Sequence, residues 1–206
     1  ATYSAGLNVL GAGNGLTSVN IVALTSVALT AVATFNFITP IVLDLNGDGI
    51  QTTTMQNGVT FDIMRGEILG MVGESGAGKS MTGNAAIGLL DRPARIASGE
   101  ILLHGERIDQ LQGEDLRRLR GKHIGMVFQD PEDQLFMPTV FDDVAFGPLN
   151  MGLSHEEIEV RVTEALERVD AVELRNKPPY HLSGGEKKRV AIATVLSMLP
   201  EILVKL

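Results

Sequence analysis

Residues 73–80 of the chain form a glycine-rich segment, Gly73-Glu74-Ser75-Gly76-Ala77-Gly78-Lys79-Ser80, with the spacing G-x-x-x-x-G-K-S. Its glycines let backbone N–H groups curl around phosphate oxygens, while Lys79 can reach the terminal phosphates and the Ser80 hydroxyl can ligate Mg²⁺. An apolar, strand-like run at 67–72 precedes the segment and a helix-prone stretch at 80–90 follows it. This context favours a nucleotide triphosphate site over a glycine-rich turn that binds nothing. The predicted binding residues are Gly73, Ser75, Gly76, Ala77, Gly78, Lys79, Ser80 and Met81.

A second segment, Leu182-Ser183-Gly184-Gly185-Glu186, also has the residues of an anion site. Ser183 and Glu186 have the S-x-x-E spacing of a capping box ahead of an apolar run at 190–199. The first turn of such a helix offers free N–H groups and the positive end of the helix dipole. A cap requires only Ser183 and Glu186, so the glycines at 184 and 185 predict that another group approaches this backbone closely.

Three oxygen-bearing side chains stand at alternate positions near the end of the uncharged region: Asp44, Asn46 and Asp48. With Gly49 and the carbonyl of Ile50 they match the opening of a calcium loop. The twelfth position, where a bidentate Glu would close the site, is Met55. The pattern therefore allows at most weak Ca²⁺ binding, and an Asn-Gly/Asp-Gly turn, the favoured interpretation, explains the same residues.

Composition excludes several classes of function. The formal net charge of −8 gives no support to nucleic-acid binding. The basic run at 117–122 follows Glu114 and Asp115 on an expected helix, which indicates a solvated helix face. The absence of cysteine excludes disulfides and thiolate metal sites.

Charge is distributed unevenly along the chain. Residues 1–43 contain no charged side chain, and every Lys and Arg lies at or after Arg65. This break predicts two segments: an uncharged, β-like or disordered segment at 1–64 and a globular segment at 65–206. Polar residues interrupt the apolar stretch at 16–34, which favours exposed or loosely packed β structure over a membrane helix. A signal peptide is disfavoured because no basic residue precedes this stretch.

The two glycine motifs, together with a strand-like run at 124–128 that leads into Gln129, resemble the ATP-binding cassette (ABC) family of transporter ATPases. The resemblance implies an α/β fold, a P-loop NTPase core with a mainly parallel sheet and a helical signature subdomain at about 131–182. It implies ATP and Mg²⁺ as cofactors. Gln129 would contact the Mg²⁺ ion, together with Ser80, and the attacking water. In the family two nucleotide-binding domains dimerise head to tail, so that Ser183, Gly184, Gly185 and Glu186 would cap the γ-phosphate held by the other domain.

The same resemblance implies transmembrane permease subunits as partners and a peripheral position on the cytoplasmic face of the plasma membrane. Residues 65–130 resemble the ATPases of peptide importers, whereas 131–206 resemble those of cobalt, nickel and vitamin importers of the energy-coupling-factor type. Residues 40–63 resemble secreted repeats-in-toxin calcium proteins. The chain is therefore interpreted as a mosaic, with a secreted calcium-binding protein or a chimera without physiological role as the alternatives.

A further capping box, Ser154 with Glu157, predicts a helix whose apolar face carries Ile158, Val162, Leu166 and Val169.

The last residues bear on catalysis. In the family the strand after the signature helix ends in an Asp that holds Mg²⁺ and is followed by a catalytic Glu. Here Leu206 occupies the Asp position and the sequence stops before the Glu. The resemblance therefore implies ATP binding with hydrolysis lost and a fold incomplete at the C-terminus, and it leaves enzymatic activity undecided.

Overall fold

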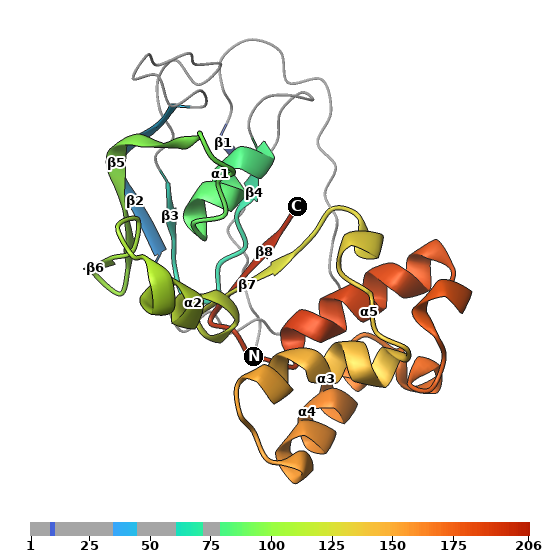
Figure 1. Ribbon diagram of the computed structural model, residues 1–206. Helices are drawn as coiled ribbons and strands as arrows, with labels where there is room; N and C mark the ends of the chain where they lie inside the picture. The colour runs from blue at the N-terminus through green and yellow to red at the C-terminus, as the bar shows by residue number, and fades with distance from the viewer. Residues whose placement is uncertain (1–8, 11–34, 45–60, 72–78) are drawn as a thin grey trace. The chain divides into compact units, whose positions relative to one another are not determined.

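A computed structural model describes residues 9–10, 35–44, 61–71 and 79–206 (Figure 1). The chain forms two compact units, residues 1–116 and 117–206, and each is described by itself. No helix within the described residues is long and apolar enough to cross a membrane.

The first unit contains a four-stranded antiparallel sheet of order β3-β2-β5-β6. Its strands are β2 (Phe35–Asp44), β3 (Asp62–Ile63), β5 (Arg95–Leu103) and β6 (Glu106–Arg107). β2 pairs with β5 from Phe35 opposite Leu103 to Asp44 opposite Arg95, with irregularities of register between. The β structure predicted for the uncharged segment is thus present at 35–44, while 16–34 lie outside the described residues.

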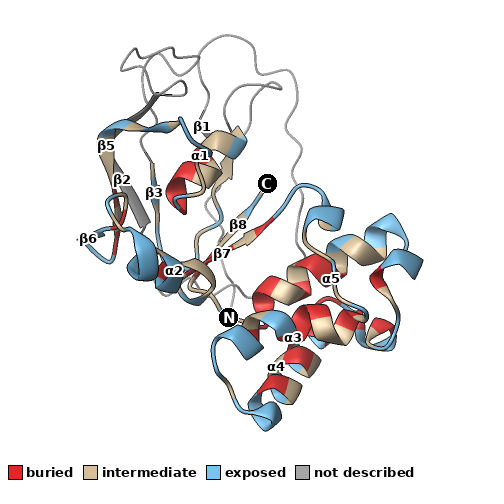
Figure 2. Ribbon diagram, in the orientation of Figure 1, coloured by how far each residue is buried: buried red, intermediate tan, exposed pale blue. Residues whose placement is uncertain are grey.

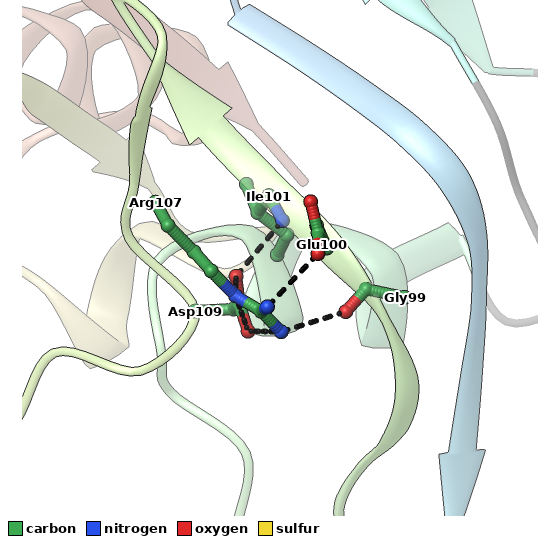
Figure 3. A network of polar contacts seen from close by, with 5 residues as sticks. All are labelled: Gly99, Glu100, Ile101, Arg107 and Asp109. Atoms are coloured by element: carbon green, nitrogen blue, oxygen red, sulfur yellow. Dashed lines mark hydrogen bonds and ion pairs between the residues drawn. The ribbon is translucent and has the colours of Figure 1, made fainter.

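Arg107 of the edge strand β6 links this strand to its neighbour β5 through hydrogen bonds (Figure 3). The Arg107 guanidinium donates to both carboxylate oxygens of Asp109, to Glu100 Oε1 at 2.9 Å and to the Gly99 carbonyl at 3.2 Å. Asp109 Oδ1 also accepts from the Ile101 amide at 3.0 Å. Burial pushes the pKa of Asp109 upward, but the hydrogen bonds from Arg107 and Ile101 outweigh it and hold that pKa below its ordinary value.

A short parallel pair and a helix complete the first unit. β4 (Gly70–Met71) pairs with β1 (Val9–Leu10), and α1 (Lys79–Ala86) follows β4 in the chain. The predicted helix to residue 90 is too long, because Gly88 has a φ of +66°. Gly88 and Leu89 donate their amides to the carbonyls of Ala85 and Asn84. These bonds form a Schellman cap that ends the helix.

The second unit packs three helices together beside a parallel pair of strands. Its helices are α3 (Val140–Asn150), α4 (His155–Arg168) and α5 (Gly184–Leu196), and its strands are β7 (Ile124–Val127) and β8 (Ile202–Lys205). Short 3₁₀ turns lie between them at η1 (Pro131–Asp133), η2 (Val172–Leu174) and η3 (Pro179–His181). α2 (Gly113–Lys122) leads into this unit and leaves the helical conformation at Arg120.

The core of the second unit lies between the facing sides of α3, α4 and α5, where Figure 2 shows the buried residues. The capping box predicted at Ser154 and Glu157 is present, and Ile158, Val162 and Leu166 of α4 are buried as predicted. The basic side chains Arg117 and Arg118 are exposed on α2, which agrees with a solvated face.

Two glycines allow elements of this unit to approach closely. A Cβ on Gly125 of β7 would lie 2.3 Å from Val195 Cγ1 of α5, and one on Gly147 of α3 would lie 2.5 Å from Met198 Cγ. Real Cβ atoms essentially never approach so closely, so both contacts depend on glycine.

The predicted α/β class is confirmed, with parallel pairs β1–β4 and β7–β8, and helices α3 and α4 lie within 131–182, whereas the bounds of a helical subdomain stay a prediction. The antiparallel sheet built on β2 was not predicted. The boundary at residue 64, drawn from composition, stays a prediction.

Candidate functional site

Most of the predicted phosphate-binding segment lies outside the described residues, and this part includes Gly73, Ser75, Gly76, Ala77 and Gly78. Its last three predicted residues, Lys79, Ser80 and Met81, form the first turn of α1. β4 before the loop and α1 after it give the strand–loop–helix order that the motif requires. Lys79 and the Ser80 hydroxyl are therefore placed at a helix N-terminus, where the helix dipole favours negative charge.

The signature segment opens α5 with the predicted capping box. Ser183 Oγ accepts from the Glu186 amide at 3.3 Å, and Glu186 Oε2 accepts from the Ser183 amide at 2.7 Å. Hydrogen bonds from Ser183 lower the pKa of Glu186, so this carboxylate is ionised at neutral pH. Leu182, 7% exposed, anchors the segment in the core.

The paired glycines of the signature are exposed. No described atom would lie within 4 Å of a Cβ at Gly184 or Gly185, and neither residue has a positive φ. Neither packing nor backbone conformation in the described structure therefore requires glycine here. In a helix, glycine is less favourable than alanine by about 1 kcal/mol, so the stability of α5 does not account for glycine at either position.

The predicted Gln129 follows β7, which ends at Val127, and is exposed. Asp130 beside it caps η1, since its Oδ1 accepts from the Glu132 amide at 2.9 Å. Gln129 and Asp130 line an open depression of about 440 Å³ whose other walls are Pro131, Asp133 and Lys188 of α5. The loop after β7 and the signature helix thus border the same hollow.

Two further residues hold the loop between β7 and α3, and the sequence interpretation missed both. Gln134 bonds the loop to α5. Asp143, only 3% exposed, accepts from the amides of Phe136 and Met137 at 3.0 Å through Oδ1, and its Oδ2 has no described partner. Burial raises the pKa of Asp143 despite those two hydrogen bonds. Gln134 lies four residues after the capping Asp130, and its role could not be inferred without knowing where α5 packs.

The calcium interpretation gains nothing from the described residues. Asp44 is the last residue of β2, opposite Arg95, and Asn46 and Asp48 lie outside the described residues. Among the residues that the structure does describe, no group of three His, Asp or Glu side chains could hold a metal ion.

Comparison with known families decides the assignment. The sequence profile of the family described as ABC transporter matches residues 56–205, well over half of the chain. The chain belongs to this family.

Relatives of the ABC chain include a putative ABC transporter ATP-binding protein of Geobacter sulfurreducens, 54% identical over 152 residues that cover 74% of this chain and 58% of that protein. The energy-coupling factor transporter ATP-binding protein EcfA of Methanothermobacter thermautotrophicus is 49% identical over 152 residues, which cover 74% of this chain and 47% of that protein. The chain thus spans about half the length of the curated relatives it matches.

Two solved structures share the fold of the ABC chain. One is cbiO1 from Clostridium perfringens, described as part of the ABC transporter complex cbiONQ, with a TM-score of 0.66 and 37% identity over 81% of this chain and 65% of that one. The other, a dimeric bacterial ABC transporter cassette, has a TM-score of 0.66 and 27% identity over 83% of this chain and 72% of that one.

These findings confirm the ABC assignment and the P-loop NTPase fold. They give no support to the toxin-repeat resemblance, to a peptide-importer portion or to Ca²⁺ as a cofactor. The profile match begins at residue 56, ahead of the boundary predicted from composition.

Proposed function

We propose that this chain is the ATP-binding component of an importer of the energy-coupling-factor type. The names of its relatives support this class of importer. The observation that carries the proposal is the exposed glycine pair in the first turn of α5, where the helix dipole favours the approach of an anion.

In this proposal MgATP binds at Gly73–Met81, with Lys79 on the terminal phosphates and the Ser80 hydroxyl on Mg²⁺. Gln129 would help to hold the Mg²⁺ ion and to orient the attacking water. The signature residues Ser183 to Glu186 contact the γ-phosphate held by a second nucleotide-binding domain. Because the first turn of α5 presents two adjacent glycines without side chains, a γ-phosphate could come within hydrogen-bond distance of the backbone amides.

The proposed partners are therefore a second copy or a related nucleotide-binding domain, together with transmembrane subunits. The chain acts at the cytoplasmic face of the membrane as a peripheral subunit. A dimeric neighbour and a neighbour that belongs to a transporter complex support these partners.

Hydrolysis depends on the residue after β8. The Leu206 amide donates to the Val127 carbonyl at 3.0 Å, which fixes this position beside the end of β7. The ABC resemblance assigns a Mg²⁺-holding Asp to it, and leucine supplies no metal ligand. We therefore propose that the 206-residue chain by itself binds nucleotide with little turnover, since phosphoryl transfer depends on the metal for charge stabilisation.

Two titrations test these proposals. Binding of a fluorescent ATP analogue should be abolished by Lys79→Ala and retained by Lys122→Ala, which removes an exposed lysine at the end of α2. Equal affinity in Lys79→Ala and the wild type would refute the nucleotide site. Leu206→Asp should make binding more dependent on Mg²⁺ than in the wild type, and an unchanged Mg²⁺ dependence would show that this position does not face the metal.

Dimerisation requires a separate measurement. Sedimentation of the wild type with MgATP should show a dimer that is absent with MgADP. Gly184→Ala combined with Gly185→Ala should leave the circular dichroism spectrum and nucleotide binding intact but remove the dimer. A dimer that persists in this double variant would refute the role of the signature glycines.

A further inference from the structure

The Gln134 side chain connects the loop after β7 to the helix that carries the signature. Its Nε2 donates to the Ala191 carbonyl at 2.7 Å and to Thr194 Oγ1 at 2.6 Å, while its Oε1 accepts from the Phe128 amide at 3.1 Å. One amide thus uses its acceptor on one element and its donors on another. The opposite orientation would place Oε1 against the Ala191 carbonyl, so the bonds fix which end of the amide faces α5.

The two ends of this bridge are next to the residues of the proposed site. Phe128 immediately precedes Gln129, the residue expected on Mg²⁺. Ala191 and Thr194 lie on α5, whose first turn contains Gly184 and Gly185. Gln134 therefore joins the backbone beside one nucleotide-contacting residue to the helix that presents the others.

The bridge is placed where hydrogen bonds are effective. Ala191 is fully buried, and the Gln134 bonds to α5 are partly buried. A second connection joins the same loop and helix, the ion pair of Glu132 Oε1 with Lys187 Nζ at 2.5 Å. Glu132 is largely exposed there, and exposed ion pairs contribute little because water screens them, so the amide bridge is the stronger of the two links.

We infer that Gln134 is a positioning residue that makes the Gln129 loop and the signature helix move as one body when nucleotide binds. This inference rests on the proposed function and goes beyond it, because it assigns the coupling between two nucleotide contacts to a side chain that touches neither nucleotide nor metal. A displacement of Gln129 on nucleotide binding would be transmitted through the Phe128 amide and Gln134 to α5, and contact at the signature would be transmitted back.

Hydrogen exchange of the full chain, followed by mass spectrometry with and without MgATP, tests the inference. In the wild type, amides of 128–136 and of 184–190 should both become protected by MgATP, by at least about fivefold, the lower range of typical coupling between sites. Gln134→Met removes both donors and the acceptor at similar length, and should leave one segment protected while the protection of the other falls to background.

Two further variants grade the effect. Gln134→Glu keeps the acceptor for Phe128 but loses both donors, so it should behave like Gln134→Met. Thr194→Val removes one of the two acceptors on α5 and should weaken the joint protection without abolishing it. Because Thr194→Val leaves Gln134 itself in place, it provides the test if the Gln134 variants fail to fold.

Nucleotide affinity, measured in the same variants, separates a positioning role from a general structural one. Affinity for the fluorescent ATP analogue should remain at the wild-type value in Gln134→Met. Joint protection of both segments in Gln134→Met, equal to that in the wild type, would overturn the inference. Absence of any MgATP-dependent protection or binding in the wild type would instead refute the proposed function, and the coupling role with it.

Discussion

Replacing Gly125 by alanine should lower the stability of the second unit. The new Cβ would lie 2.3 Å from Val195 Cγ1 and 3.0 and 3.3 Å from two ring carbons of Pro200. Val195 is only 2% exposed and, as a β-branched residue, has few alternative rotamers. The proline ring cannot swing aside either, so β7 and α5 would have to separate.

The size of the loss follows from overpacking. Inserting a methyl group into a well-packed core typically costs about 1–3 kcal/mol, and the short distance to Val195 places Gly125→Ala toward the upper end. Gly184→Ala is the matched control, because its Cβ meets no described atom within 4 Å. Helix propensity favours alanine there by up to about 1 kcal/mol, so the two identical substitutions should change stability in opposite directions.

Urea unfolding followed by circular dichroism at 222 nm measures both effects, since α3, α4 and α5 supply most of the helix among the described residues. Gly125→Ala should lower the midpoint without changing the slope of the transition. A double-mutant cycle with Val195→Ala then tests the cause, because this second change removes the Cγ1 atom. The combined variant should lose less stability than the sum of the two single losses.

Either of two results would refute this reasoning. Additive losses in the cycle would show that Gly125 and Val195 do not compete for the same space. A Gly125→Ala variant as stable as Gly184→Ala would show that β7 does not approach α5 as closely as the structure places it.

Three other substitutions have defined outcomes. Asp109→Ala leaves the buried Ile101 amide without its acceptor and should lower the free energy of unfolding in urea by about 1–3 kcal/mol. Because the folded-state pKa of Asp109 is lowered, the stability that Asp109 contributes is complete above about pH 4 and should disappear as the pH falls further. The wild type and the variant should therefore become equally stable in acid. Asp143→Ala, which deprives two amides of their acceptor, should be less stable than Asp143→Asn. Since burial raises the folded-state pKa of Asp143, the wild type should lose stability relative to Asp143→Asn as the pH rises from about 4 through that pKa. A difference in stability that stays constant with pH would contradict the raised pKa. Ser154→Ala removes the N-cap of α4 and should cost about 0.5–2 kcal/mol, with a change below that range arguing against the capping box.

Local patterns in the sequence predicted much of the second unit. A capping box is a contact between residues three apart, so Ser154 with Glu157 and Ser183 with Glu186 could be recognised without tertiary structure. The buried face of α4 followed from helical periodicity for the same reason. The exposed glycines at 184 and 185 were notable because a cap alone does not require them.

Contacts between distant residues could not be predicted. Gln134 resembles any polar loop residue until α5 is known to pack beside it, 57 and 60 residues away in sequence. Asp143 likewise appears as one of two acidic residues in the first turn of α3, and only packing shows that it is buried. The end of α1 was misjudged because a single glycine in the left-handed region outweighed the helix propensity of the residues after it.

The pairing of β2 with β5 determines which piece of this polypeptide can be handled in solution. β5 forms hydrogen bonds to β2 along most of its length and to β6 at only Leu102 and Leu103. A recombinant fragment that begins at Arg65, where the charged residues start, would lack both β2 and β3 and would leave unpaired the edge of β5 that bonds to β2. Such an open edge recruits strands from other molecules. Trimming at the change in composition should therefore yield aggregates, whereas fragments that begin before Phe35 should remain dispersed.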